Sequence, residues 1–201
     1  CEESPTHGFC VDACLDLDTD AQNCGVCGRA CDAEVECIDG FCGGLYAFDG
    51  IRQDVPDAEL GGWEVCHADL YRDRNANLDA VRAACDGEFV MYGCRRVGNA
   101  NWQLLAMGER NEVFQNTGDG NNNLNLHNGV EWYFSTGSSM GFVNPGSGVG
   151  RNSCDIGVLA DAELRLCWHT NGNLITGGFR CGNEQRLNAS GDWERKIWTS
   201  R

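Results

Sequence analysis

Cysteine is the residue type that offers the most chemistry in this 201-residue chain, which contains fourteen of them. The cysteines form two groups of even size, one within the first 42 residues and one spread over the remainder. In chain order they are Cys1, Cys10, Cys14, Cys24, Cys27, Cys31, Cys37 and Cys42, then Cys66, Cys85, Cys94, Cys154, Cys167 and Cys181. In an oxidising compartment each even group predicts a disulfide framework, whereas a reducing cytosol would keep the thiols free. We therefore predict a secreted or extracellular protein in which all fourteen cysteines are oxidised within their own group.

Metal binding by the first group is the alternative use of these cysteines. Cys24-x-x-Cys27, followed by Cys31 and Cys37, could supply four thiolates to a zinc ion. Tetrahedral zinc sites usually have two well-separated pairs of ligands, and here the cysteines are crowded together with four others. Disulfides are therefore the favoured interpretation.

A second metal candidate consists of alternating oxygen ligands. It comprises Asp73, Asn75, Asn77 and Asp79, in the pattern D-x-N-x-N-x-D that opens a calcium loop. The sixth position, normally glycine, is Leu78, and the twelfth, normally glutamate, is Ala84. Calcium is the one cofactor that the sequence suggests, and none is required. The same Asn77 is equally well explained as the N-cap of a helix.

A serine motif raises the question of hydrolysis. Residues 137–141 read G-S-S-M-G, which matches G-x-S-x-G around Ser139, and Asp155 or Asp161 and then His169 follow in the order of a hydrolase triad. That motif requires a helix directly after the serine, and the sequence that follows is rich in glycine and contains Pro145. We therefore predict a turn at Ser139 and no enzyme activity, and a secreted hydrolase is the second alternative.

Aromatic residues and asparagine-rich loops suggest a different alternative, binding of carbohydrate. The aromatic set is Trp132, Tyr133, Phe134, Phe142, Trp168, Phe179, Trp193 and Trp198. Core packing is the default expectation, but rings exposed beside loops such as 116–129 could stack on sugars. Asn188-Ala189-Ser190 also fits the acceptor sequence for N-glycosylation.

The elements that would position these residues are mostly short strands. Segments 63–71, 88–94, 101–107, 130–135, 164–170 and 194–198 are each short and rich in β-forming residues. One helix is predicted, with Asn77 as N-cap, Leu78 and Val81 at helical spacing, and Gly87 beyond its end. The expected fold is mainly β with one short helix.

Charge separates the chain into parts. Residues 1–60 carry fourteen acids and two arginines, a net charge of −12 out of the total of −15. We predict a disulfide-stapled arm (1–42), a linker (43–62) and a compact β-rich domain (63–201) with six cysteines. The negative charge argues against nucleic acid as a partner, and no apolar run approaches the ~18 residues that a transmembrane helix needs.

The arm resembles a cysteine-rich repeat that occurs, often in tandem, in secreted proteins of myxobacteria-like bacteria. The resemblance is based on Cys10-x-x-x-Cys14, the D-T-D at 18–20, N-C-G-V-C-G-R-A-C at 23–31, Cys37 and the closing G-F-C at 40–42. It implies a structural repeat without a catalytic role. The domain is similar to an extracellular bacterial module of unknown activity, through W-E-V-C, R-N-S-C-D, R-L-C-W-H-T and G-G-F-R-C-G.

Together these patterns favour a non-enzymatic extracellular protein with a structural or adhesive role. Its expected partners are copies of itself, in a filament or surface layer, and the first alternative is a secreted carbohydrate-binding module with glycans as partners. Because the sequence begins with cysteine, we expect a processed or truncated form, and a lipid on Cys1 would attach it to a cell surface.

Overall fold

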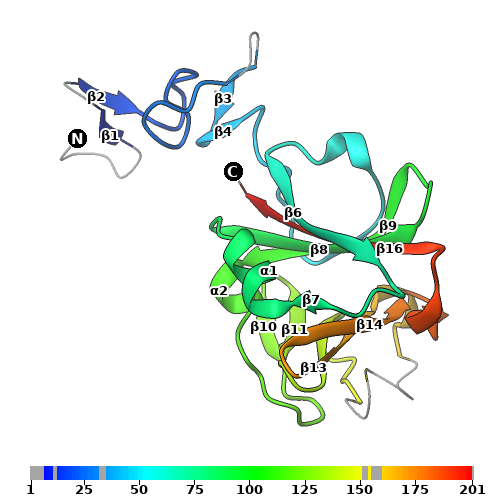
Figure 1. Cartoon of the computed structure of the whole chain (residues 1–201). Coiled ribbons are helices and arrows are strands. Elements are labelled where there is room, and N and C mark those ends of the chain that lie inside the picture. The colour runs from blue at the N-terminus through cyan, green and yellow to red at the C-terminus, as the bar shows by residue number, and fades with distance from the viewer. Residues whose placement is uncertain (1–6, 11–12, 32–34, 151–153, 155–159, 201) are drawn as a thin grey trace. The chain divides into compact units, whose positions relative to one another are not determined.

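The structure, a computed structural model, describes residues 7–10, 13–31, 35–150, 154 and 160–200. The fold is mainly β, as predicted (Figure 1). The chain divides into two compact units. The first contains the described residues up to Ala47, together with Ala58–Glu64 and Ser200; the second contains Phe48–Asp57 and Val65–Thr199.

The first unit contains very little regular structure. Its strands are β1 (His7–Cys10), β2 (Ala13–Asp16), β3 (Cys37–Ile38) and β4 (Phe41–Cys42), which form two separate antiparallel hairpins. Near its other end, the Trp63 indole N–H donates to the carbonyl of Tyr46 at 2.9 Å. Such short hairpins have little independent stability, so other bonds must hold this unit.

The second unit contains two larger sheets, except for Trp63, Glu64 and Ser200 at the ends of β6 and β16, which belong to the first unit. The five-stranded sheet has the order β5 (Ile51–Pro56), β9 (Asn101–Glu109), β8 (Phe89–Arg96), β16 (Trp193–Ser200) and β6 (Trp63–Leu70). The seven-stranded sheet has the order β10 (Asn125–His127), β11 (Val130–Phe134), β12 (Ser139–Val143), β13 (Leu166–Asn171), β14 (Leu174–Cys181) and β15 (Glu184–Gln185), with β7 (Ala76–Asn77) also pairing with β14.

The main hydrophobic core contains side chains from both of these sheets. Tyr92 of β8 stacks on Trp168 of β13 with ring centroids 5.2 Å apart, and it meets Trp132 of β11 edge to face at 5.5 Å. The Cys94–Cys181 disulfide joins β8 to β14 through the same core. The sheets therefore share one aromatic and disulfide-linked interior, which stabilises the unit mainly by burial of apolar area.

The predicted helix is present as α1 (Leu78–Ala84), with Asn77 as its N-cap. The Asn77 side chain accepts a hydrogen bond from the N–H of Ala80 at 3.0 Å, which satisfies one of the free amides of the first turn. Cys85 at the C-terminal end of α1 forms a disulfide with Cys66 of β6. A single further turn, α2 (Arg110–Val113), follows β9. Neither described α-helix has the length and apolar character needed to cross a membrane.

All six predicted strand segments contain a strand, in β6, β8, β9, β11, β13 and β16. The predicted linker 43–62 is more than a connector, because β5 lies within it and pairs with β9. The sequence does not suggest this strand, because aspartate and proline are both uncommon in strands. Asp54 adopts a positive φ of 57°, and Pro56 is the last residue of the strand. Proline is tolerated there because β5 is an edge strand.

Candidate functional site

Three overlapping disulfides hold the cysteine-rich arm. They are Cys10–Cys27, Cys24–Cys37 and Cys31–Cys42, and each loop begins before the previous one has closed. Cys14 is also disulfide-bonded, whereas Cys1 lies outside the described residues. In the other group the pairs are Cys66–Cys85, Cys94–Cys181 and Cys154–Cys167. Each of these six disulfides joins cysteines of the same group, and no described cysteine is free.

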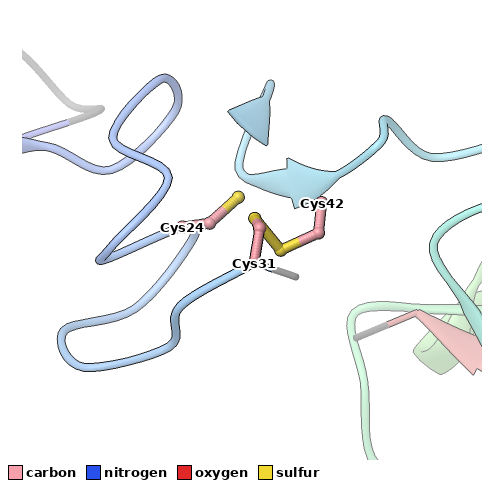
Figure 2. Close-up of side chains that lie close together, drawn as sticks. All are labelled: Cys24, Cys31 and Cys42. Carbon is pink, nitrogen blue, oxygen red and sulfur yellow. A yellow bond between two sulfur atoms is a disulfide. The ribbon is translucent and has the colours of Figure 1, made fainter. Parts of the chain in front are cut away.

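Three sulfur atoms in the arm lie as close together as the ligands of a metal ion do. The sulfurs of Cys24, Cys31 and Cys42 all lie within 4.8 Å of one another (Figure 2). Cys24 is bonded to Cys37, however, and Cys31 to Cys42. Zinc is bound by thiolates, so the zinc alternative on Cys24, Cys27, Cys31 and Cys37 is incompatible with the observed disulfides.

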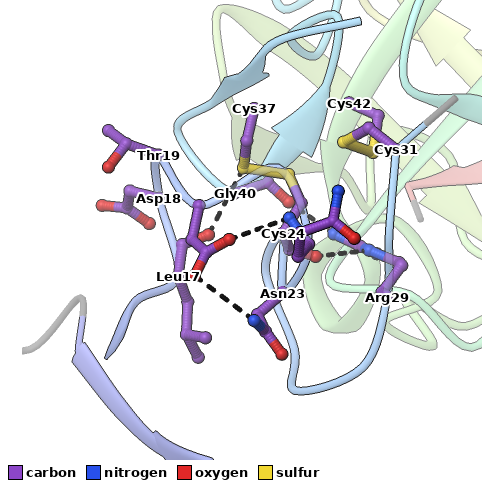
Figure 3. The surroundings of a disulfide bond; sticks show 12 residues. Leu17, Asp18, Thr19, Asn23, Cys24, Arg29, Cys31, Cys37, Gly40 and Cys42 are labelled. Carbon is purple, nitrogen blue, oxygen red and sulfur yellow. Dashed lines mark hydrogen bonds between the residues drawn. A yellow bond between two sulfur atoms is a disulfide. The ribbon is translucent and has the colours of Figure 1, made fainter. Parts of the chain in front are cut away.

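Hydrogen bonds from one arginine reinforce the disulfides (Figure 3). The Arg29 guanidinium donates to the carbonyls of Cys24 and Gly40. The amide of Gly25 donates to the carbonyl of Leu17 at 2.7 Å. Covalent and polar contacts thus fix the arm where an apolar core would otherwise be needed.

The apolar side chains of the arm remain at the surface. Among described residues 7–47, the only buried hydrophobic residues are Cys10, Cys24 and Cys37. Phe9, Val26 and Ile38 are 69%, 53% and 46% exposed. We refer to these three side chains as the arm apolar residues. A disulfide-held module that exposes a phenylalanine to this degree has apolar surface available to a partner.

Among the predicted calcium ligands, Asp73 and Asn75 lie in the loop between β6 and β7, Asn77 ends β7, and Asp79 lies in the first turn of α1. Asp73 accepts from a backbone N–H three residues earlier at 2.9 Å, and Asn77 caps α1. The Asp79 carboxylate accepts from the side-chain amide of Asn173 at 2.7 Å. These hydrogen bonds account for Asp73, Asn77 and Asp79 without a metal ion: Asp73 stabilises a turn, Asn77 caps a helix and Asp79 binds a loop.

Ser139 is the first residue of strand β12, and the predicted turn ends directly before it, in the bend at residues 136–138. The residue is fully buried and stands opposite His169 of β13 in the register. Asp161 accepts from the side chains of Asn144 and Ser147, and Asp155 lies outside the described residues. A nucleophile inside a strand and inaccessible to solvent lacks the exposed strand-to-helix turn that a hydrolase of this type requires.

All eight aromatic residues of the proposed sugar-binding set are buried, which excludes them as exposed stacking platforms. Trp132, Phe134, Phe142, Trp168 and Trp193 lie in the main core. Tyr133 and Phe179 belong to a smaller cluster together with the Cys154–Cys167 disulfide. The core-packing expectation is therefore correct, and a carbohydrate site would have to be built from other residues.

A buried ionic group in the second unit was not predicted from the sequence. Arg195 of β16 is fully buried and pairs with Asp69 of β6, whose Oδ2 atom also lies 3.2 Å from Nε2 of His67. Burial, the largest single effect, raises the pKa of Asp69, but hydrogen bonds from His67 and Arg195 and their charges outweigh it and hold the pKa below its ordinary value. β6 and β16 each contain other charged residues, so the sequence alone does not single out this pair.

Asn188 of the predicted glycosylation site lies in the 3₁₀ turn Leu187–Ala189. The side chain is only partly exposed, and its Oδ1 atom is buried without a hydrogen-bond partner among the described residues. The backbone carbonyl accepts from Arg74 at 3.4 Å.

A polar depression lies on the loop that connects α2 to β10. Amide side chains line most of it: Gln115, Asn116, Asn122, Asn123 and Asn125. Most of the lining belongs to the asparagine-rich segment 116–129 that the sequence singled out, and Leu124 is its only apolar residue.

No protein-family model matches the chain, and the searches of curated proteins and of solved structures found no match either.

Proposed function

We propose that this protein is a non-enzymatic, extracellular structural or adhesive protein, and that its cysteine-rich arm provides the adhesive contact. The exposure of the arm apolar residues Phe9, Val26 and Ile38 is the observation that carries the proposal. A partner surface would remove these side chains from water, at a gain of about 25 cal/mol per Å² of apolar area.

The disulfides support an extracellular location and a durable contact module. Six pairs are formed among the described cysteines, which matches an oxidising environment. A module cross-linked in this way is already ordered before it binds. Binding then costs little conformational entropy compared with a flexible segment of the same length.

The partner that we propose is a second copy of the chain, and the attraction is between the negatively charged arm of one copy and basic side chains of the other. The arm, residues 1–42, contains ten acids and one arginine, a net charge of −9, and this charge opposes contact between two arms. The basic side chains of the second unit provide the complementary charge, but fewer of them are accessible than the sequence suggests.

Arg165, Arg180 and Arg195 are fully buried. The exposed arginines among the described residues after Gly62 are Arg72, Arg74, Arg96 and Arg186. An arm that binds these arginines on another copy makes a heterologous contact, which propagates into a ring or a filament.

Sedimentation velocity over a range of protein and salt concentrations tests the proposal. We expect the full chain to associate with increasing concentration and to dissociate as added salt screens the charges. Replacement of the arm apolar residues by Phe9→Ser, Val26→Ser and Ile38→Ser should leave the protein monomeric at concentrations where the unmodified chain associates.

A matched control replaces three exposed apolar residues of the second unit, by Val65→Ser, Val97→Ser and Leu126→Ser. This variant should associate like the unmodified chain. A chain that stays monomeric at every concentration, or equal association of the two triple variants, would contradict the proposal. Electron microscopy of the associated material would distinguish rings from filaments.

A further inference from the structure

The amide-lined depression between α2 and β10 contains side chains whose orientation is already fixed. The Oδ1 atom of Asn116 accepts from the N–H of Gly118 at 2.9 Å, and Oδ1 of Asn122 accepts from the N–H of Val149 at 2.7 Å. Each bond holds the amide by its oxygen and leaves its two N–H donors for another partner.

Asn125 is held in the opposite sense. Its Nδ2 group donates to the backbone carbonyl of Glu112 at 3.0 Å and to the carboxylate of the same residue at 2.9 Å. The Oδ1 atom of Asn125 is left as an acceptor. The lining thus combines fixed donors, from Asn116 and Asn122, with a fixed acceptor, and its other amides belong to Gln115 and Asn123.

The chemistry of this lining selects among ligand classes. No residue that lines the depression is charged, so it lacks the carboxylates that a bound metal cation prefers and the basic groups that an anion requires. A hydroxyl group both donates and accepts hydrogen bonds, and therefore suits fixed amide donors placed near a fixed amide acceptor.

We infer that the depression is a binding site for a neutral saccharide, whose hydroxyl groups bond to Asn116, Asn122 and Asn125. The side chain of Leu124 supplies apolar contact for the C–H groups of a sugar ring. The lining contains no aromatic ring, so a single sugar unit binds weakly. Copies of the protein presented side by side would bind a polysaccharide more strongly than one copy does.

Affinity electrophoresis of the full chain through gels that contain dextran, mannan, xylan or soluble chitin derivatives tests this inference. At least one of these neutral polysaccharides should retard the unmodified protein. The informative variant is Asn116→Asp with Asn122→Asp. An aspartate keeps the oxygen that accepts from the Gly118 or Val149 amide and loses the N–H donors, so the local fold is preserved.

We expect the double variant to bind the retarding polysaccharide at least tenfold more weakly. The control is Asn99→Asp together with Asn183→Asp, which makes the same change of charge at exposed positions outside the depression. This control should be retarded like the unmodified chain.

Gln115→Ala is a second variant for the case in which the aspartates disturb the loop. The Gln115 side chain is exposed and makes no hydrogen bond to another described residue, so its removal leaves the fold unchanged and should weaken retardation. The inference is overturned if no polysaccharide retards the protein, or if the lining variants and the control are retarded equally. Because retardation can be measured at protein concentrations too low for association, it is independent of the proposed arm contact.

Discussion

Arg195 and Asp69 form a two-point ion pair in the interior of the second unit. Nε of Arg195 contacts Oδ1 of Asp69, and the second guanidinium nitrogen lies 2.9 Å from Oδ2. The guanidinium carbon also lies 5.9 Å from the centre of the Tyr71 ring and 5.7 Å from that of Trp168. The arginine is thus enclosed by aromatic rings, and Asp69 is the carboxylate that compensates its charge.

Removal of this carboxylate should destabilise the protein strongly. We expect Asp69→Asn to lower the free energy of unfolding by about 3–5 kcal/mol, because it leaves a buried guanidinium without a counter-charge. Denaturant titration at neutral pH measures the change. Asp86→Asn, at an exposed position, is the control and should have little effect. Equal losses for the two variants would show that the ion pair does not matter for stability.

His169 should make stability depend on pH in the mildly acidic range. Burial lowers the pKa of His169 below 6.5, and the nearby positive charges of Arg195 and Arg74 lower it further. The unfolded chain therefore takes up a proton at a higher pH than the folded chain does, so the free energy of unfolding falls as the pH drops below about 6.5. Unfolding curves between pH 7.5 and 5 should be less sensitive to pH in His169→Gln. An identical pH dependence in both proteins would contradict this expectation.

Two disulfides of the second unit, one that closes a long loop and one that closes a short loop, should contribute unequally to stability. Cys94–Cys181 spans 87 residues and Cys154–Cys167 spans 13, and all four cysteines are fully buried. The loop-entropy relation gives stabilisations of about 4.6 and about 2.9 kcal/mol. Paired cysteine-to-alanine variants, compared by denaturant titration, should therefore differ by about 2 kcal/mol. A greater loss from the short-range pair would contradict the entropic explanation.

Gly178 should tolerate no side chain. A Cβ atom at this position would lie 1.9 Å from the Tyr71 ring, whereas at Gly137 the nearest atom would be 3.6 Å away, at the Asp119 carboxylate. We expect Gly178→Ala to lower the melting temperature severely and Gly137→Ala to change it little. Thermal unfolding followed by circular dichroism measures both, and a well-folded Gly178→Ala variant would contradict the close packing of Tyr71 on β14.

Ser139 should not react with a fluorophosphonate. The side chain is fully buried in β12, so the reagent cannot reach its hydroxyl group in the folded protein. Intact-mass spectrometry after incubation should detect no adduct at this serine. An adduct mapped to Ser139 would show that the strand opens and would restore the hydrolase alternative.

The sequence predicts those elements whose signals are local. The capping of α1 by Asn77 and the alternation along β13 depend on neighbouring residues, so both could be read in advance. Strand β14 is not among the predicted segments. It contains Gly178, whose missing side chain admits the ring of Tyr71, more than a hundred residues earlier. A contact over such a separation leaves no local signal.

The same distinction between local and long-range signals applies to the candidate sites. The cysteine groups and the asparagine-rich loop were visible as composition, and the structure adds which cysteines pair and which amide atoms are already bonded. Core packing was the expectation for the aromatic set, but only the structure excludes exposed rings, because a tryptophan beside a loop has the same local sequence whether its ring faces solvent or the core. The Asp69–Arg195 pair joins β6 and β16, which are far apart in the sequence and become neighbours only through the strand order of the sheet.

The span of the Cys94–Cys181 disulfide has a consequence for biogenesis. A chain emerges from its amino-terminal end, and at 5–20 residues per second Cys94 precedes its partner by roughly 4–17 s. The Cys66 and Cys85 thiols have by then emerged and can pair, whereas Cys154 and Cys167 emerge while Cys94 is still free. Capture of Cys94 by either of them would prevent formation of the native Cys94–Cys181 bond. Correct maturation thus depends on early closure of the short Cys154–Cys167 loop, or on a disulfide isomerase that reopens the wrong bond.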